Sequence, residues 1–254
     1  MGSVKIFSDI NRIMNPNVTP YNKELSKKEQ VADMFNNIAH KYDFLNHILS
    51  MGIDIIWRKK AIKLLKPSNP KVMLDIATGT GDFALEALSI KPKTVTGIDI
   101  SEGMLEKGKQ KMKEKGVDDI IQLELGDSEK INFNDNYFDA ITVGFGVRNF
   151  ENLELGLSEM HRVLSANGKA AILEFSKPKK FPIKQLYNFY FLNILPGIGK
   201  LISKDARAYT YLPESVNAFP DGRDFENILT KVGFKSVKTY PLSFGIASIY
   251  LATK

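Results

Sequence analysis

Residues 72–81 read VMLDIATGTG, and this stretch decides the fold. The run from Val72 to Ala77 is apolar and short, as in a buried strand. It ends in Thr78-Gly79-Thr80-Gly81, and a helical pattern follows over residues 82–88. Glycines at a strand-to-helix turn let a ligand approach the backbone closely. The stretch therefore predicts a strand, a ligand-binding turn and a helix in direct succession.

Strand and helix patterns continue to alternate downstream of this turn. We expect further strands at 94–99, 120–125, 138–144, 170–175, 236–240 and 246–252, and helices that begin after Ser101 and at Leu153 and Arg223. Asn167-Gly168 is interpreted as the end of the helix over 153–164. The alternation predicts an α/β fold, with a doubly wound, mostly parallel seven-stranded sheet and helices on both faces.

The segments that flank the alternating pattern predict accessory structure. Residues 1–25 are expected to form an irregular arm, and residues 26–254 a single domain. Ser26 and Glu29 have the spacing of a capping box, so a helix should begin there. Together with a second helix over 54–65, it would make a helical lid over 26–66. Residues 177–220 are expected to be a helical insertion that binds substrate or membrane.

Composition excludes several kinds of site. The chain has 254 residues, no cysteine and a net charge of +6. Without cysteine there can be no disulfide, cysteine-ligated zinc, iron–sulfur cluster or cysteine nucleophile. No histidine and carboxylate set has metal-ligand spacing, so no metal is expected. The chain has no uninterrupted apolar stretch of about 18 residues and no secretory signal, which predicts a cytoplasmic protein without a membrane-spanning helix.

The excess positive charge is concentrated in one segment. Residues 177–204 contain six lysines and no acidic residue, with aromatic and aliphatic side chains between the lysines. Apolar side chains bounded by lysines are typical of interfacial membrane elements. The segment predicts peripheral contact with an anionic membrane, at the inner face of the cytoplasmic membrane. A core helix with a solvated basic rim, or a dimer contact, is the alternative.

Acidic side chains follow the predicted turn and the next strands. Asp99 ends the second strand 20 residues after Gly79, at the spacing expected for an acid that binds ribose hydroxyls. Asp127 follows the third strand, where a carboxylate can accept from an adenine amino group. Ala77 replaces the first glycine of the dinucleotide fingerprint, and Asp82 would repel a phosphate at the helix start. A cofactor that carries a sulfonium and an ammonium suits this turn better.

These motifs together resemble the class I S-adenosylmethionine-dependent methyltransferases. Three further stretches, MFNNIAHKYDFLNHILSMGIDIIWR at 34–58, GFGVRNF at 144–150 and RAYTYLPESVNAFP at 207–220, are similar to the demethylmenaquinone/2-polyprenyl-methoxybenzoquinol methyltransferase family. The resemblance implies methyl transfer from S-adenosylmethionine to a ring carbon of a prenylated quinol. It favours demethylmenaquinol as the acceptor, with the ubiquinone-pathway benzoquinol or another acceptor as alternatives. It also makes a homodimer an expectation.

The resemblance also assigns expected roles to residues of these motifs. In that family the glycine-rich turn holds the methionine part of the cofactor, the second-strand acid the ribose and the third-strand acid the adenine. The corresponding cofactor-binding residues here are Asp75, Gly79, Thr80, Gly81, Asp99, Ile100, Asp127, Ser128 and Gly144.

The acceptor site is expected beyond the fourth strand. Arg148 follows that strand, and a cation there would lower the pKa of a quinol hydroxyl and so stabilise the phenolate, or it would orient a water that takes the proton. A structural arginine paired with a carboxylate is the alternative. His40 or Tyr42 could serve as the base. Asn149, Tyr209 and Tyr211 are candidate substrate-binding residues.

Three rival functions share parts of these patterns. Enzymes that methylate base amino groups usually carry an Asn/Asp-Pro-Pro-Tyr/Phe motif after the fourth strand, and Val143-Gly144-Phe145-Gly146 lacks it. With no evident RNA-binding appendage either, a nucleic-acid partner is not expected. A nicotinamide-dependent reductase would need the missing first glycine. A non-catalytic quinone-binding protein would have little reason to keep the acids of the cofactor motif.

Overall fold

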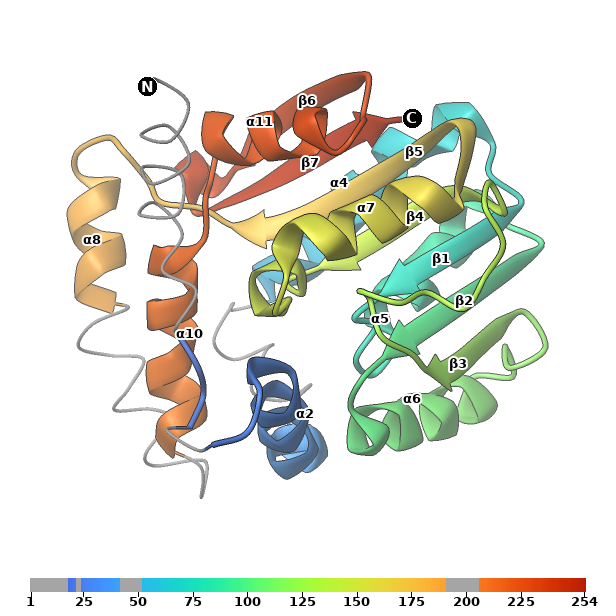
Figure 1. The fold of residues 1–254 in the computed structure, drawn as a ribbon, viewed down its shortest axis with the longest axis horizontal. Helices are drawn as coiled ribbons and strands as arrows, with labels where there is room; N and C mark the ends of the chain where they lie inside the picture. The colour runs from blue at the N-terminus through green and yellow to red at the C-terminus, as the bar shows by residue number, and fades with distance from the viewer. Residues whose placement is uncertain (1–17, 22–23, 42–51, 191–205) are drawn as a thin grey trace, which may run out of the picture.

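A computed structural model of the chain describes residues 18–21, 24–41, 52–190 and 206–254 (Figure 1). Seven strands form one sheet in the order β3-β2-β1-β4-β5-β7-β6. Strands β1 to β5 are parallel, and β7 runs antiparallel to both β5 and β6. The strands are β1 (Val72–Ile76), β2 (Thr94–Asp99), β3 (Ile121–Leu125), β4 (Phe138–Gly144), β5 (Leu164–Phe175), β6 (Ser236–Leu242) and β7 (Ala247–Thr253). The predicted α/β fold with a seven-stranded, mostly parallel sheet is confirmed.

Helices cover both faces of the sheet. The α-helices are α2 (Lys27–Ile38), α4 (Ile53–Leu65), α5 (Asp82–Ala87), α6 (Glu102–Glu114), α7 (Leu153–Val163), α8 (Ile183–Phe189), α10 (Ala206–Ala218) and α11 (Arg223–Lys231). Short 3₁₀ turns are η1 (Ala39–Lys41), η2 (Lys66–Ser68), η3 (Leu88–Ile90), η4 (Val147–Asn149) and η6 (Ser243–Gly245). Figure 1 shows α7 in front of the sheet and α4 behind it.

Two apolar cores fill the space between the sheet and its helices. Leu74 and Ile76 of β1 belong to the core that α7 and α11 cover, whereas Met73 belongs to the core that α4, α5 and α6 cover. Successive side chains of a strand point to opposite faces, so β1 supplies both cores. Because both faces are buried, the strand sequence is almost continuously apolar and shows no alternation with polar residues.

Strand β5 differs from the sequence prediction. The helix before it ends at Val163, and β5 begins at Leu164, so the expectation that Asn167-Gly168 closes the helix is wrong. The pairing of β5 with β4 moves from Phe138↔Leu164 to Ala140↔Lys169, two residues on β4 but five on β5. The extra residues form an irregularity at which Asn167 has a φ of +64°. The turn signal was therefore real, but it lies inside the strand.

Helix α2 begins as its capping signal predicts. Ser26 Oγ accepts from the backbone N–H of Glu29 at 3.2 Å, and the backbone N–H of Ser26 donates to Glu29 Oε2 at 2.9 Å. The helix buries Val31 and Met34 against Tyr211 of α10. In Figure 1, α2 lies beyond the carboxyl ends of β1 and β2, beside α10. It thus reaches the sheet edge at which a ligand is expected.

Helix α4 of the predicted lid and helix α8 of the predicted insertion pack on different parts of the fold. Helix α4 packs on the sheet through Trp57, Ile62 and Leu65. Helix α8 packs on α10 through Tyr187 and Val216. In the described ranges, no helix is long and apolar enough to cross a membrane.

Candidate functional site

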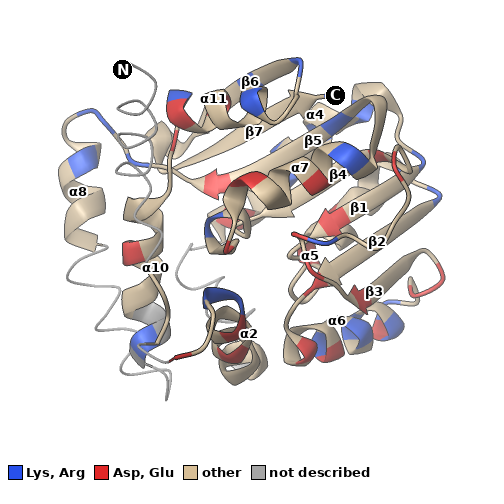
Figure 2. Ribbon diagram, viewed as in Figure 1, with Lys and Arg blue, Asp and Glu red and all other residues tan. Residues whose placement is uncertain are grey.

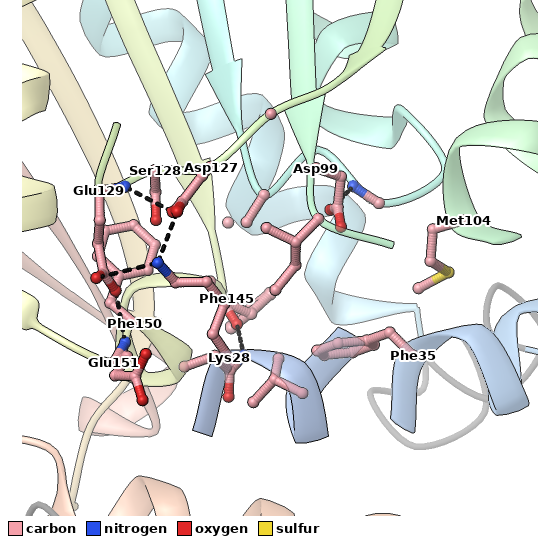
Figure 3. Close-up of a pocket in the computed structure, with 18 residues that line it drawn as sticks. Lys28, Phe35, Asp99, Met104, Asp127, Ser128, Glu129, Phe145, Phe150 and Glu151 are labelled. Atoms are coloured by element: carbon pink, nitrogen blue, oxygen red, sulfur yellow. Dashed lines mark hydrogen bonds and ion pairs between the residues drawn. The ribbon is translucent and has the colours of Figure 1, made fainter. Parts of the chain in front are cut away.

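A pocket lies at the carboxyl ends of β1, β2, β3 and β4, with α2 as its outer wall (Figure 3). Open α/β sheets bind ligands at this edge. The pocket is lined by six of the nine predicted cofactor-binding residues, which are Gly79, Asp99, Ile100, Asp127, Ser128 and Gly144. The structure therefore brings together residues from four separate loops. The other three, Asp75, Thr80 and Gly81, do not line it.

Those three residues stabilise the glycine-rich turn through hydrogen bonds and close packing. Asp75 is fully buried and accepts from the hydroxyls of Thr78 at 2.6 Å and Thr142 at 2.7 Å. Burial raises the pKa of Asp75 to about 6, although both hydroxyls favour the charged form. Thr80 Oγ1 accepts from Lys111 Nζ at 2.9 Å. Gly81 has a φ of +83°, and a Cβ there would lie 2.4 Å from Met112 Cε.

Asp99 connects the glycine-rich turn to the start of α6. Its Oδ2 accepts from the backbone N–H of Gly79 at 2.8 Å, and its Oδ1 accepts from that of Ser101 at 2.9 Å. Burial raises the pKa of Asp99, and the backbone N–H groups oppose that effect. Each carboxylate oxygen has a second lone pair, so Asp99 can still accept from a ligand hydroxyl.

Lys28 of α2 reaches across the pocket to the loop after β3 (Figure 3). Its Nζ lies 2.6 Å from Asp127 Oδ2 and 3.3 Å from Glu129 Oε2. Burial alone would lower the pKa of Lys28, but the two carboxylates together outweigh it and raise that pKa. Asp127 is thus already paired with a cation from the outer wall. Its Oδ1 also accepts from the backbone N–H of Glu129 at 2.9 Å, which fixes the orientation of the carboxylate.

The charges of the pocket fit a cationic cofactor. Four carboxylates line it against a single lysine, namely Asp99, Asp127, Glu129 and Glu151 against Lys28. A phosphate would be repelled by this excess of carboxylates, whereas a sulfonium, an ammonium, ribose hydroxyls and an adenine amino group are all attracted by acceptors. The residues present therefore fit S-adenosylmethionine. In the part of the chain that the structure describes, no cluster of three His, Asp or Glu side chains could hold a metal ion.

Arg148 lies in η4, between the pocket-lining residues Gly146 and Asn149; it does not itself line the pocket, and its side chain is almost fully buried. Its Nη1 donates to Glu174 Oε1 at 2.7 Å and also to the backbone oxygen of Phe145. The guanidinium carbon lies 5.6 Å from the centre of the Phe175 ring. The carboxylate partner foreseen in one of the two interpretations of Arg148 is therefore present.

The predicted acceptor-binding residues are placed as follows. Asn149 lines the pocket, and its Oδ1 accepts from Tyr211 Oη at 3.1 Å. Burial raises the pKa of Tyr211, so its hydroxyl stays protonated. Tyr209 belongs to α10, but its side chain lies outside the described residues. His40 is exposed on η1 and does not line the pocket, and Tyr42 lies outside the described residues.

The sequence did not lead us to predict three charged residues that line the pocket, Lys28, Glu129 and Glu151, or Glu174, which pairs with Arg148. Lys28 and Glu129 come together only in the fold, since 101 positions separate them. Glu174 carried a usable signal, because it is an acid near the carboxyl end of the apolar strand β5, as Asp99 is in β2.

The chain is similar in sequence to known proteins. The model of the ubiE/COQ5 methyltransferase family matches residues 23–254. The chain is 49% identical to demethylmenaquinone methyltransferase of Bacteroides fragilis, over 93% of this chain and 97% of that protein. It is 44% identical to the ubiquinone/menaquinone biosynthesis C-methyltransferase UbiE of Geotalea uraniireducens, over 91% of this chain and 99% of that protein.

Similarity to solved structures supports the fold. A putative S-adenosyl-L-methionine-dependent methyltransferase from Methanococcus maripaludis superposes with a TM-score of 0.63 at 20% identity, over 92% of this chain and 96% of that one.

Proposed function

Since the chain belongs to the ubiE/COQ5 methyltransferase family, we propose that it transfers a methyl group from S-adenosylmethionine to a ring carbon of demethylmenaquinol. The observation that carries this proposal is the acid-rich pocket at the carboxyl ends of β1 to β4. C-methylation of the prenylated methoxybenzoquinol of ubiquinone biosynthesis is the second candidate, because the Geotalea relative is named for both pathways.

Each part of the cofactor has a residue that suits it. Asp99 offers carboxylate oxygens to the ribose hydroxyls, and Asp127 offers one to the adenine amino group. The turn at Gly79 and the strand end at Gly144 leave room for the methionine part. Asp75, Thr80 and Gly81 support that turn from behind. When bound, the cofactor supplies an electrophilic methyl group.

The residues beyond β4 would prepare the acceptor. A quinol hydroxyl resembles that of tyrosine, whose pKa is about 10. Arg148 would stabilise the phenolate that forms when this hydroxyl loses its proton. The guanidinium has no free lone pair and cannot itself take that proton. Asn149 and Tyr211, which are joined by a hydrogen bond, would contact the acceptor. Tyr209, Tyr42 and His40 stay candidates for substrate contact or for the base.

A peripheral membrane contact through 177–204 would bring the enzyme to a bilayer-dissolved quinol. In the described part of this segment, Phe181, Leu186 and Phe189 are 81%, 62% and 59% exposed. Figure 2 shows lysines and no acidic residue on α8 and on the loop before it. Phe244 of η6 is 83% exposed. Ser176 Oγ donates to the backbone oxygen of Gly245 at 3.0 Å, which holds η6 beside the start of this segment.

Vesicle sedimentation tests this contact. We expect the protein to sediment with vesicles that contain phosphatidylglycerol, and the F181S/F189S double variant to remain largely in the supernatant. Leu155→Ser removes an apolar side chain that is 45% exposed on α7, and this variant should sediment normally. Equal sedimentation of all three proteins, or of none, would contradict the membrane surface.

The acceptor is tested with two quinols offered separately. Purified protein and S-adenosylmethionine are mixed with chemically reduced demethylmenaquinone or with reduced 2-methoxy-6-polyprenyl-1,4-benzoquinone, and the products are separated by chromatography. We expect methylated product from the naphthoquinol. Product from the benzoquinol alone would establish the second candidate, and product from neither would refute the proposed function.

A further inference from the structure

Glu174 is a buried acid that neither cofactor binding nor sheet packing explains. It precedes the last residue of β5 and is fully buried. Its Oε1 accepts from Arg148 Nη1 at 2.7 Å and from the backbone N–H of Phe175 at 2.8 Å. The desolvation of two buried charges often exceeds the gain from pairing them, so such a pair is weak evidence of a role in stability. Buried charged groups beside a pocket are more typical of functional sites.

The contacts of Arg148 leave one buried donor atom, Nε, without an acceptor in the described part of the chain. Nη1 is used by Glu174 and by the backbone oxygen of Phe145. Nε is buried, and none of the described residues accepts a hydrogen bond from it. A buried donor without an acceptor costs about 1–3 kcal/mol, and such donors are rare in native proteins. An oxygen of a bound ligand would satisfy this donor.

We propose that Glu174 is a positioning residue for methyl transfer: it holds the guanidinium of Arg148 through Nη1, so that Nε–H can donate to a ring oxygen of the quinol. This inference rests on the proposed function, because it takes the ligand oxygen to be that of the methyl acceptor. Glu174 acts through Arg148 and need not touch the substrate. A guanidinium without this partner could rotate about its side-chain bonds and lose that alignment.

The pair gives the reaction an acid limb. Burial raises the pKa of Glu174, and the charge of Arg148 opposes that rise. As the pH falls through the raised pKa of Glu174, its carboxylate is protonated, the ion pair is lost and turnover should fall. Four titratable side chains of the packed elements interact electrostatically with the pair, namely Lys27 on α2, Tyr187 on α8, Tyr211 on α10 and Tyr250 on β7. Asp221, which is paired with Lys177, acts on Tyr187 and Tyr250.

Glu174→Gln removes the charge and keeps the shape. With saturating cofactor we expect kcat to fall about 100-fold, as for a misaligned catalytic group, and the acid limb of the kcat profile to disappear. The affinity for S-adenosylmethionine should be unchanged, because Glu174 does not line the cofactor pocket. Glu174→Asp shortens the side chain but keeps the charge, and it should lower kcat while the acid limb remains.

Glu159→Gln is the matched control. Glu159 also accepts from an arginine at 2.7 Å, Arg162 Nε, and from a backbone N–H at 2.9 Å, that of Ile131. It lies on α7, away from the pocket. A general loss of stability would lower Tm in both Gln variants, but only Glu174→Gln should change the kcat profile.

The outcomes separate this inference from the proposed function. A wild-type protein that methylates neither prenylated quinol refutes the function itself. An active wild type whose kcat and acid limb are unchanged in Glu174→Gln overturns the role of Glu174. If Glu174→Gln does not fold, Glu174→Asp decides, and wild-type kcat in that variant overturns the inference equally.

Discussion

Replacement of Asp99 by Asn tests how the glycine-rich turn is built and how it binds cofactor. The two carboxylate oxygens accept from the backbone N–H groups of Gly79 and Ser101 at 2.8 and 2.9 Å. An Asn side chain of the same shape offers only one acceptor oxygen. One of the two backbone N–H groups must then face an NH₂ group in a buried place.

Asp99→Asn should change both the free energy of unfolding and the Kd for S-adenosylmethionine. A buried donor that loses its acceptor costs about 1–3 kcal/mol of stability. Loss of the charged acceptor for the ribose hydroxyls should cost about 1.5–3 kcal/mol of binding, which is about a 10-fold to 150-fold rise in the Kd for S-adenosylmethionine. Affinity of the wild type should also fall at low pH, because burial raises the pKa of Asp99 and the protonated form loses an acceptor.

Calorimetric titration with S-adenosylmethionine and urea unfolding measure the two effects on the same samples. Asp139→Asn is the control, since Asp139 Oδ2 accepts from the backbone N–H groups of Lys71 and Val72 at 2.8 and 2.9 Å, at the opposite edge of the sheet. It should leave the Kd unchanged. An Asp99→Asn protein whose Kd lies within about twofold of the wild type would refute the assignment of Asp99 to the cofactor.

Three further predictions concern the walls of the pocket. A Cβ at Gly146 would lie 2.5 Å from Ala77 Cβ and 3.2 Å from Val143 Cγ1. Gly146→Ala should therefore lower the free energy of unfolding in urea by about 1–3 kcal/mol and raise the Kd for cofactor. An unchanged free energy of unfolding would contradict the tight packing. Burial lowers the pKa of Lys27 to about 8, so between pH 8 and 10.5 the folded state binds fewer protons than the unfolded state. The free energy of unfolding of the wild type, relative to that of Lys27→Met, should therefore rise with pH over this range. Parallel curves of unfolding free energy against pH would refute this. Lys28 and Asp127 are each about one-third exposed, so their ion pair should contribute little to stability. Lys28→Met should change the free energy of unfolding by less than about 1 kcal/mol, and by less still in high salt. A loss that does not depend on salt would contradict this and show that the pair is shielded from solvent.

The sequence predicted those parts of the fold that depend on local signals. The strand, turn and helix over 72–88 and the capping box at Ser26 each depend on side chains close together in the chain, and all appear in the structure. The start of β5 could not be predicted in this way. Asn167-Gly168 is a turn signal in either setting, and only the pairing with β4 shows that the turn lies within a strand.

The sequence allowed us to predict the site residues at the ends of the strands. It did not allow us to predict the contacts that α2 makes with the opposite wall of the pocket. Asp99 and Gly144 end strands, and Asp127 follows one; because the carboxyl ends of these strands meet at one edge, their positions could be inferred from the fold class. The pairing of Lys28 with Asp127 joins residues 99 positions apart, and no local spacing encodes it. Glu174 could have been found, because an acid near the end of an apolar strand is the same signal that identified Asp99.

Transfer of a labelled methyl group tests the central claim most directly. Purified protein is mixed with S-adenosylmethionine that carries a trideuterated methyl group and with reduced demethylmenaquinone, and the product is analysed by mass spectrometry and NMR, with Asp99→Asn as the binding-deficient comparison. We predict a product in which the intact CD₃ group is bonded to a ring carbon, and much less of it from Asp99→Asn at limiting cofactor. A CD₃ group on a quinol oxygen, or an unlabelled quinol, would contradict the account.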